Sequence, residues 1–375
     1  MQRFGKNSTI KVGRRKLHIQ TVIDDDNSLA IASIFDDGTL LFKQEKNVQK
    51  GLSENILSEE LDQFHQAIVA DVELLFYVAE KVKSTKHAQS RNKMGRLFLE
   101  KSFIDEAIEE FRIAIKLEPG KPRHYFDLGK AFYMKGVYPE AIKWLKIAAE
   151  HGPVYADIRF LLGHAFWMNH DFYDAVFELR KAVELNENYH QALFSLGMVL
   201  IDSAESALKD KRFPSPIERI SQANQYIQRA TQLSDEYNKE HVDSGVALLK
   251  EKQLKEALQE LKAANPSIGV KVSRTSESEF FLKFMFGGLG KDEQMIDDYI
   301  ANLLLAQKDH PDYADLHNNL GVAYLIKARN MFLRAIDEFR EAIKINPYYE
   351  KAKKNLRLAE NDGRGLLILL RAILK

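Results

Sequence analysis

The sequence predicts a mainly α-helical protein: an α-solenoid of about seven helix-turn-helix repeats behind a small N-terminal three-stranded antiparallel β-meander and a helix. Glycine recurs every 34 residues, at positions 95, 129, 163 and 197, and a fixed period of this length is typical of repeat architectures. Residues 1–50 differ in kind, because their apolar and polar side chains alternate as in strands. With 45 % hydrophobic residues in 375, the apolar surface suffices for a substantial core.

The composition excludes several classes of protein. Lysine and arginine together number 54, as do aspartate and glutamate, so no net field attracts nucleic acid or an acidic membrane. The absence of cysteine excludes disulfides, thiolate metal sites and cysteine nucleophiles. The opening residues MQRFGKNSTIKVGRRK contain no apolar run, unlike a signal peptide. We therefore expect a cytoplasmic protein without a nucleic-acid partner.

Three alternating or β-branched runs predict the strands of the meander. They cover residues 10–23, 28–35 and 39–46. Asp37-Gly38 lies between the second and third runs, and Asp-Gly between two strands is a strong hairpin signal.

A helix over residues 56–82 is predicted to cover this meander, because a lone three-stranded sheet buries too little surface to be stable. Its apolar residues fall on one stripe at helical spacing. They are Leu57, Leu61, Phe64, Ile68, Val72, Leu75 and Val82. The alternative is that the stripe pairs with its copy in a dimer.

The repeat continues after residue 197 with insertions, since glycine returns at 245, 287 and 321. In the first unit, a break near Lys101-Ser102 separates two short helices. Each second helix carries large residues at one offset: Phe111, Leu145, Leu179, Ile227, Leu261, Leu303 and Phe339. These are flanked by Ala107, Ala141, Ala175, Ala223, Ala257, Tyr299 and Ala335, and by Ala114, Ala148, Ala182, Ala230, Ala264, Ala306 and Ala342. A small residue lets two helix backbones approach, and the large residue fills the groove that opens.

This pattern resembles the tetratricopeptide repeat family, whose unit of 34 residues is a helix-turn-helix. The resemblance covers roughly residues 88–360. Three positions of the later units depart from the family pattern: Ser244, Gly290 and Tyr299. The resemblance implies a stack of helix pairs with a concave face.

The predicted organisation has four parts, namely the meander (1–50), the long helix and a linker (51–87), the array (88–360) and an apolar C-terminal tail (361–375). Two inserts, near 203–219 and 265–279, interrupt the array. The first is charged and contains proline, and the second is rich in serine. Both are expected to form exposed loops, which either carry partner contacts or are tolerated insertions.

The sequence predicts no enzyme, metal site or cofactor. The stretch FGGLGKDEQ lacks the first glycine and the hydroxyl of a phosphate-binding loop, so we interpret it as a glycine turn between two helices. The acidic turn at Asp24, Asp25 and Asp26 lacks the alternating ligands of a calcium loop. The eleven histidines show no recognisable metal spacing, and no GxSxG nucleophile motif occurs.

The resemblance implies that four positions on each unit's first helix line the concave groove. Here they are Asn92, Arg96, Leu99 and Glu100; Phe126, Lys130, Tyr133 and Met134; Phe160, His164, Trp167 and Met168; and Phe194, Met198 and Ile201. Three consecutive units thus present a phenylalanine, while Arg96, Lys130 and His164 form a basic row. Family members that hold a peptide's terminal carboxylate use a lysine and asparagine pair, which Asn92 and Arg96 do not reproduce.

These residues suggest a protein–protein interaction scaffold or adaptor whose aromatic, partly basic groove binds a partner peptide or helix. Alternatively, the aromatic residues pack on neighbouring helices, or a terminal helix of the chain fills the groove. The tail GLLILLRAILK is a cap on the last repeat, a segment inserted into another protein or another copy, or an in-plane membrane anchor. The rival functions are therefore a membrane-peripheral assembly factor, a self-associating scaffold and a repeat-regulated enzyme.

Overall fold

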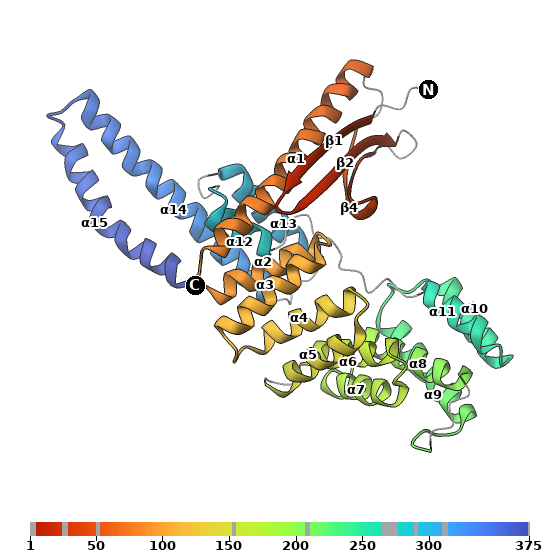
Figure 1. Ribbon diagram of the computed structural model, residues 1–375. Helices are drawn as coiled ribbons and strands as arrows, with labels where there is room; N and C mark the ends of the chain where they lie inside the picture. The colour runs from red at the N-terminus through yellow and green to blue at the C-terminus, as the bar shows by residue number, and fades with distance from the viewer. Residues whose placement is uncertain are drawn as a thin grey trace. The chain divides into compact units, whose positions relative to one another are not determined.

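The computed structural model describes residues 5–24, 29–49, 53–151, 155–206, 211–264, 277–288, 292–309 and 314–373. The chain divides into two compact units, which are described separately below. The first contains Met1–Leu97 and Val272–Lys375, and the second contains Phe98–Lys271. Helices dominate both units, and a small antiparallel sheet begins the chain (Figure 1).

The N-terminal sheet has four strands, not the three predicted from the sequence. They are β1 (Gly5–Val12), β2 (Arg15–Asp24), β3 (Leu29–Asp36) and β4 (Thr39–Asn47), and they pair in sequence order. The predicted strand 10–23 is split by a two-residue turn at Gly13 and Arg14, where Gly13 has φ +57°. Glycine with positive φ at the first turn position matches the right-handed twist of a hairpin, so this turn reverses the chain.

The hairpin predicted at Asp37-Gly38 is confirmed. Both residues have positive φ, +45° and +79°, and they connect β3 to β4. This is the backbone of a two-residue hairpin turn, which Asp-Gly favours. The acidic turn after Asp24 lies outside the described residues.

Helix α1 (Glu54–Lys83) covers one face of the sheet, as predicted, and contacts β1, β2 and β3. Leu17, Ile19 and Ile34 are fully buried beneath it. The imidazole of His65 lies between two hydroxyls, with Thr21 Oγ1 at 2.8 Å from Nδ1 and Ser8 Oγ at 3.0 Å from Nε2. Both nitrogens of this buried ring therefore have partners. The apolar stripe of the helix is buried or packs on this core at Leu57, Leu61, Phe64, Ile68, Val72, Leu75 and Val82.

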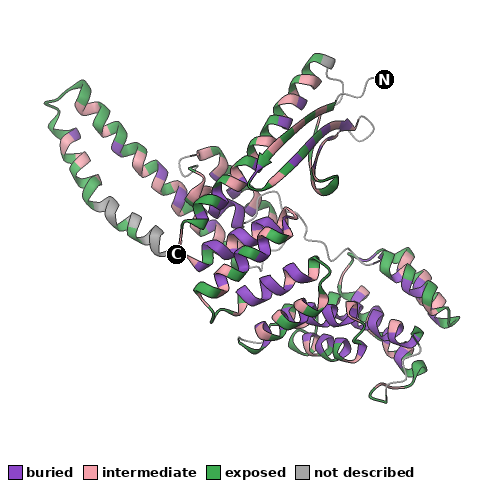
Figure 2. Cartoon of the chain, viewed as in Figure 1, coloured by how far each residue is buried: buried purple, intermediate pink, exposed green. Residues whose placement is uncertain are grey.

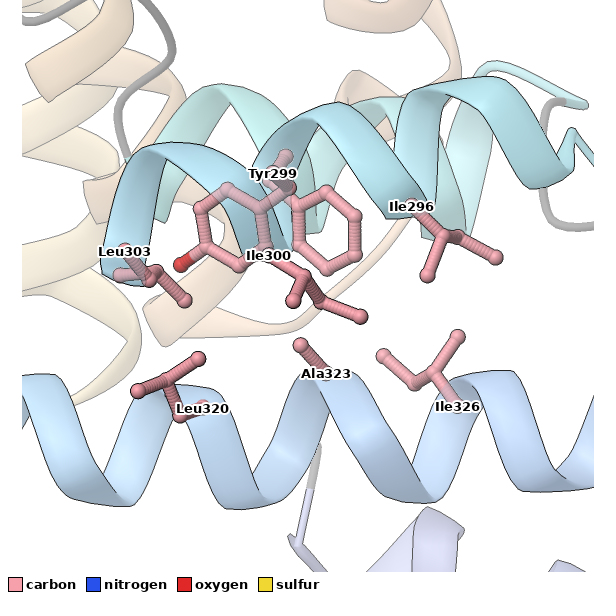
Figure 3. Packing of buried hydrophobic residues seen from close by; sticks show 8 residues of the cluster. Ile296, Tyr299, Ile300, Leu303, Leu320, Ala323 and Ile326 are labelled. Carbon is pink, nitrogen blue, oxygen red and sulfur yellow. The ribbon is translucent and has the colours of Figure 1, made fainter. Parts of the chain in front are cut away.

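The same unit contains α2 (Ala88–Glu100) up to Leu97, and it also contains α12 (Glu277–Phe286), α13 (Glu293–Asp309), α14 (Ala314–Ile345) and α15 (Glu350–Ile373). Ile296 and Ile300 of α13 face Ala323 and Ile326 of α14 in a buried hydrophobic cluster (Figure 3). Lys283 of α12 pairs with Asp71 of α1 and with Glu279. Burial and packing thus join the N-terminal helix to the C-terminal part of the chain.

The sixth repeat packs differently from the predicted pattern. Gly287 follows the last residue of α12, so it does not lie where two helices cross. The ring of Phe280 instead stacks on Tyr299, with ring centroids 3.9 Å apart and planes 8° apart. An aromatic pair therefore replaces the glycine contact, which explains why position 299 is not alanine. A glycine turn was also predicted here, in the stretch FGGLGKDEQ. Gly288 of this stretch has φ +75°, and residues 289–291 lie outside the described part.

The seventh repeat does not form the two helices that were predicted. Helix α14 runs without a break from Ala314 to Ile345, through the predicted turn. Lys327, Ala328, Arg329 and Met331 are strong helix formers, and no glycine or proline interrupts them. Its partner is α15, against which it packs as an antiparallel hairpin.

The second compact unit, Phe98–Lys271, stacks helix pairs, as predicted. Its helices are α3 (Ile104–Leu117), α4 (Pro122–Met134), α5 (Tyr138–Glu150), α6 (Ala156–Met168), α7 (Phe172–Leu185), α8 (His190–Glu205), α9 (Pro216–Leu233), α10 (Lys239–Lys250) and α11 (Leu254–Ala264). In each of four pairs a Cβ on the glycine would meet the predicted large side chain at 2.6–2.7 Å. The pairs are Gly129 with Leu145, Gly163 with Leu179, Gly197 with Ile227 and Gly245 with Leu261. The close approach that the repeat predicts is therefore present.

The first helices of four repeats end in the same type of turn. The residues seven after the repeat glycines, Ser102, Gly136, His170 and Lys252, have φ between +60° and +77°. In each turn, the next N–H bonds back to the carbonyl five residues earlier, for example Asp171 N–H to Phe166 O at 2.9 Å. These bonds define a Schellman motif, which ends the helix and satisfies its last carbonyls.

The insert near 203–219 is anchored at its end. Ser215 and Glu218 form a capping box that begins α9. Arg219 is buried and donates to Ser203 O at 2.6 Å, and Phe213 contacts Tyr173 edge-on. Residues 207–210 lie outside the described part, as do residues 265–276 of the second insert.

Candidate functional site

Apart from Leu99 and Glu100 at the end of α2, the predicted groove residues of the second compact unit lie on α4, α6 and α8, the first helices of three consecutive repeats. Helix α6 contacts both α4 and α8, so the three present one row. Figure 2 shows these helices as largely buried. The row contains Phe126, Lys130, Tyr133, Met134, Phe160, His164, Trp167, Met168, Phe194 and Met198.

Aromatic contacts between successive helices bury the floor of this row. Phe126 and Phe160 are each 7 % exposed, and Phe194 is 0 % exposed. The ring of Phe160 lies 5.1 Å from Tyr189, centroid to centroid. Phe194 stacks on Tyr237 at 4.5 Å. The phenylalanines therefore contribute to packing between neighbouring repeats, which is one of the alternatives left open by the sequence.

His164 is buried at the centre of the row and is not part of a basic surface. Its Nε2 lies 2.7 Å from Ser195 Oγ of α8. Its ring contacts Phe160 and Trp167. Burial lowers the pKa of His164 to about 4, so the ring is neutral at pH 7. The predicted basic row thus loses its third member.

Trp167 is held by a residue that the sequence analysis missed. Its indole Nε1–H donates to a carboxylate oxygen of Asp202 at 2.6 Å. Asp202 occupies the same position in the fourth unit as Met134 and Met168 in the units before it, five residues after the repeat glycine. Extending that register by one unit would have identified it. The carboxylate adds a negative group to a row expected to be apolar and basic.

Four residues remain accessible along the edge of the row, and we call them the rim: Lys130, Tyr133, Met134 and Met168. Met134 is 37 % exposed, and the other three are half-buried. Burial, together with Tyr138, raises the pKa of Tyr133 to about 12, so its phenol stays protonated. The rim combines apolar, hydroxyl and cationic groups. Such a surface can bind an apolar side chain with a polar or acidic neighbour.

Two residues of the first repeat that were predicted to line the groove, Asn92 and Arg96, belong to the other compact unit. Asn92 is buried in α2, and Arg96 is half-buried. Both precede the division after Leu97. They are therefore described apart from the rim, and their participation in one groove stays a prediction.

Within the described ranges, no group of three or more histidine, aspartate or glutamate residues is placed to hold a metal ion. None of the helices, so far as they are described, is long and apolar enough to cross a membrane. The chemistry of the row is that of packing and hydrogen bonding.

Comparison with known proteins identifies the repeat. A family model described as tetratricopeptide repeat matches residues 92–156. Searching the curated proteins gives no match. Among solved structures, MamA is 23 % identical with a TM-score of 0.36, covering 46 % of this chain and 92 % of its own. YrrB, whose title calls it a TPR protein with an unusual peptide-binding site, is 20 % identical with a TM-score of 0.38, covering 50 % and 90 %.

A MamA fragment from Desulfovibrio magneticus RS-1 is 17 % identical with a TM-score of 0.38 and covers 48 % of this chain and 93 % of its own. At these TM-scores the likenesses carry no argument about function. The family match and the glycine contacts of four helix pairs do identify the architecture. Residues 92–156 are thus identified as tetratricopeptide repeats, and the helix pairs that follow continue the same glycine packing.

Proposed function

We propose that this protein is a scaffold or adaptor that binds a partner peptide or helix along the row on α4, α6 and α8. The observation that carries the proposal is the rim, where Met134 and its neighbours keep accessible surface beside a packed aromatic floor. Methionine adapts its shape to different partners. Helices of repeat arrays also offer extended concave surfaces.

The burial of the floor indicates how a partner would bind. Phe194 and Met198 are 0 % and 1 % exposed, so they support the surface from below. A partner would contact Tyr133, Met134 and Met168 directly, and Lys130 would lie beside an acidic group of the partner. The role of the buried residues is then to hold these rim side chains in position.

Capture of a partner from cell extract, followed by titration of the identified partner with purified protein, tests this proposal. The variant with Met134→Glu and Met168→Glu puts two charges on the rim, and we expect it to bind at least tenfold more weakly. The matched control is Phe177→Glu. Phe177 is 46 % exposed on α7, the second helix of its repeat, whereas the rim lies on first helices. Unchanged affinity in the rim variant would refute the proposed site.

A second candidate function rests on the C-terminal tail. Helix α15 carries the backbone of the tail as far as Ile373, and Ile368 is 67 % exposed. An exposed isoleucine within an apolar run favours association with a second copy or with a membrane surface. Sedimentation of the full chain and of a chain ending at Asp362, with and without lipid vesicles, tests it. A monomeric full chain that stays off vesicles would contradict this candidate.

A further inference from the structure

Small residues recur at every seventh position of helix α14, which belongs to the first compact unit. Figure 2 shows exposed and buried residues alternating along this helix. Leu320, Ala323 and Ile326 are buried in the cluster with α13. The small residues are exposed instead, apart from one that is half-buried, Ala342. They are Ala314, Gly321, Ala328, Ala335 and Ala342.

A second series of residues lies three positions further along in each heptad and carries larger side chains. Tyr324 is 50 % exposed, Met331 is 62 % exposed and Ile345 is 85 % exposed. Two series at this spacing form one continuous stripe on a helix, as in a coiled coil. We call this stripe the seam. Its larger members are His317, Tyr324, Met331, Glu338 and Ile345, all of them exposed.

The earlier repeats show how such small residues are normally covered. Four alanines at the repeat position that Ala335 occupies are fully buried: Ala141, Ala175, Ala223 and Ala257. Gly321 likewise has the position of the glycines that touch the second helices of their repeats. Because α14 is continuous, Gly321 and Ala335 lie about 21 Å apart along its axis and cannot meet. The partner of this surface is therefore not the other half of α14.

The seam is complementary to a second copy of itself. When two α14 helices run antiparallel, with the two-fold axis between residues 329 and 330, every larger residue lies opposite a small one. Such an isologous contact uses the same surface on both copies. Glu338 then lies opposite Gly321, where the seam offers most room, so its carboxylate stays hydrated. The other pairs are Tyr324 with Ala335, Met331 with Ala328, Ile345 with Ala314 and His317 with Ala342.

The charges beside the seam are already balanced within each copy. In the antiparallel arrangement, Lys327 of one copy approaches Arg334 of the other. Lys327 Nζ lies 2.5 Å from a carboxylate oxygen of Asp297, and Arg334 Nη2 lies 2.9 Å from one of Glu293. These acids of α13 reduce the repulsion between the two cations. We propose that two copies of this chain associate through the seam, with their α14 helices antiparallel.

Sedimentation velocity of the full chain over a range of concentrations tests the proposal, and we expect a monomer–dimer equilibrium. Ala328→Glu places a carboxylate of each copy close to the two-fold axis, so it should weaken dimerisation at least tenfold. The matched control is Ala70→Glu, which adds the same charge at an exposed position of α1 and should dimerise as the wild type does. A full chain that is monomeric up to its highest soluble concentration would overturn the proposal, as would equal dimerisation of the two variants.

A chain ending at Asp362 separates the seam from the C-terminal tail. It keeps all of α14 and the first half of α15, so it should dimerise as the full chain does. If this truncation abolishes the dimer while Ala328→Glu retains it, association depends on the tail and the seam is not the interface.

Single cysteines test the antiparallel register, because the chain has no cysteine of its own. In this register the two copies of residue 328 lie about 4.5 Å apart along the helix axes, and those of residue 345 lie about 46 Å apart. A short bismaleimide should therefore cross-link Ala328→Cys into a dimer and leave Ile345→Cys unlinked, although both positions are exposed. Efficient cross-linking of Ile345→Cys, or none of Ala328→Cys, would overturn the arrangement.

Discussion

The indole nitrogen of Trp167 on α6 donates a hydrogen bond of 2.6 Å to the carboxylate of Asp202 on α8. This bond joins the first helices of two consecutive repeats. Trp167 is only 6 % exposed, so solvent does not replace the bond if it is lost. Polar contact and aromatic packing together hold the row in one arrangement.

Replacing Asp202 with alanine should lower the free energy of unfolding by about 1–3 kcal/mol, because it leaves the buried indole N–H without an acceptor. Urea denaturation measures the loss. The double variant with Trp167→Phe is the control, since no donor then remains. If the loss from Asp202→Ala is as large in the Trp167→Phe background as in the wild type, the bond does not contribute to stability.

Two glycines should respond in opposite ways to alanine. At Gly163 a Cβ would lie 2.7 Å from Leu179 Cγ and 3.1 Å from Ala175 O, so Gly163→Ala should destabilise by about 1–3 kcal/mol. At Gly321, inside α14, a Cβ would meet nothing within 4 Å, so Gly321→Ala should stabilise by about 1 kcal/mol. Thermal unfolding compares the two variants. Effects of the same sign would contradict the packing described here.

The shared turn of the repeats offers a stabilising substitution. Lys252 has φ +61°, and Gly136 occupies the same position with φ +77°. Left-handed backbone is costly for lysine and not for glycine. Lys252→Gly should therefore raise the free energy of unfolding by about 0.5–1 kcal/mol, and Gly136→Ala should lower it. Chemical denaturation checks both, and a destabilised Lys252→Gly would show that the lysine side chain matters more than the backbone.

Much of the fold could be predicted because small residues determine it locally. The 34-residue interval predicts the crossings at Gly129, Gly163 and Gly197, and the same interval with an insertion predicts the one at Gly245; each is present. The same rule did not hold at Gly287 and Gly321, where an aromatic stack and a continuous helix replace the glycine crossing. The extra strand was missed because the apolar pattern continues on both sides of the turn at Gly13.

The candidate site was less predictable, because burial depends on contacts between different repeats. His164 reads as a surface cation by its position, yet Ser195, 31 residues later, covers its Nε2. No spacing within one helix contains that information. Asp202 is the exception, since its register with Met134 and Met168 is visible in the sequence.

The buried His164 should make stability depend on pH. Its pKa is about 4 in the folded protein, against 6.5 for the free side chain. Between these values the unfolded chain binds a proton that the folded chain does not, so stability is complete above pH 6.5 and is lost as the pH falls towards 4. The total loss is roughly 3 kcal/mol. Denaturation of His164→Gln at several pH values should show a shallower decline than the wild type, and an equal decline would exclude His164 as its cause.

The central claim is that a partner contacts the rim on α4 and α6. NMR of the chain with ¹³C-labelled methionine methyl groups tests it directly, because the chain has only eight methionines and each can be assigned by substitution with leucine. On saturation with the captured partner, the signals of Met134 and Met168 should shift, while that of Met331, which is 62 % exposed on α14, should not. Complete binding with the Met134 and Met168 signals unchanged would contradict the account.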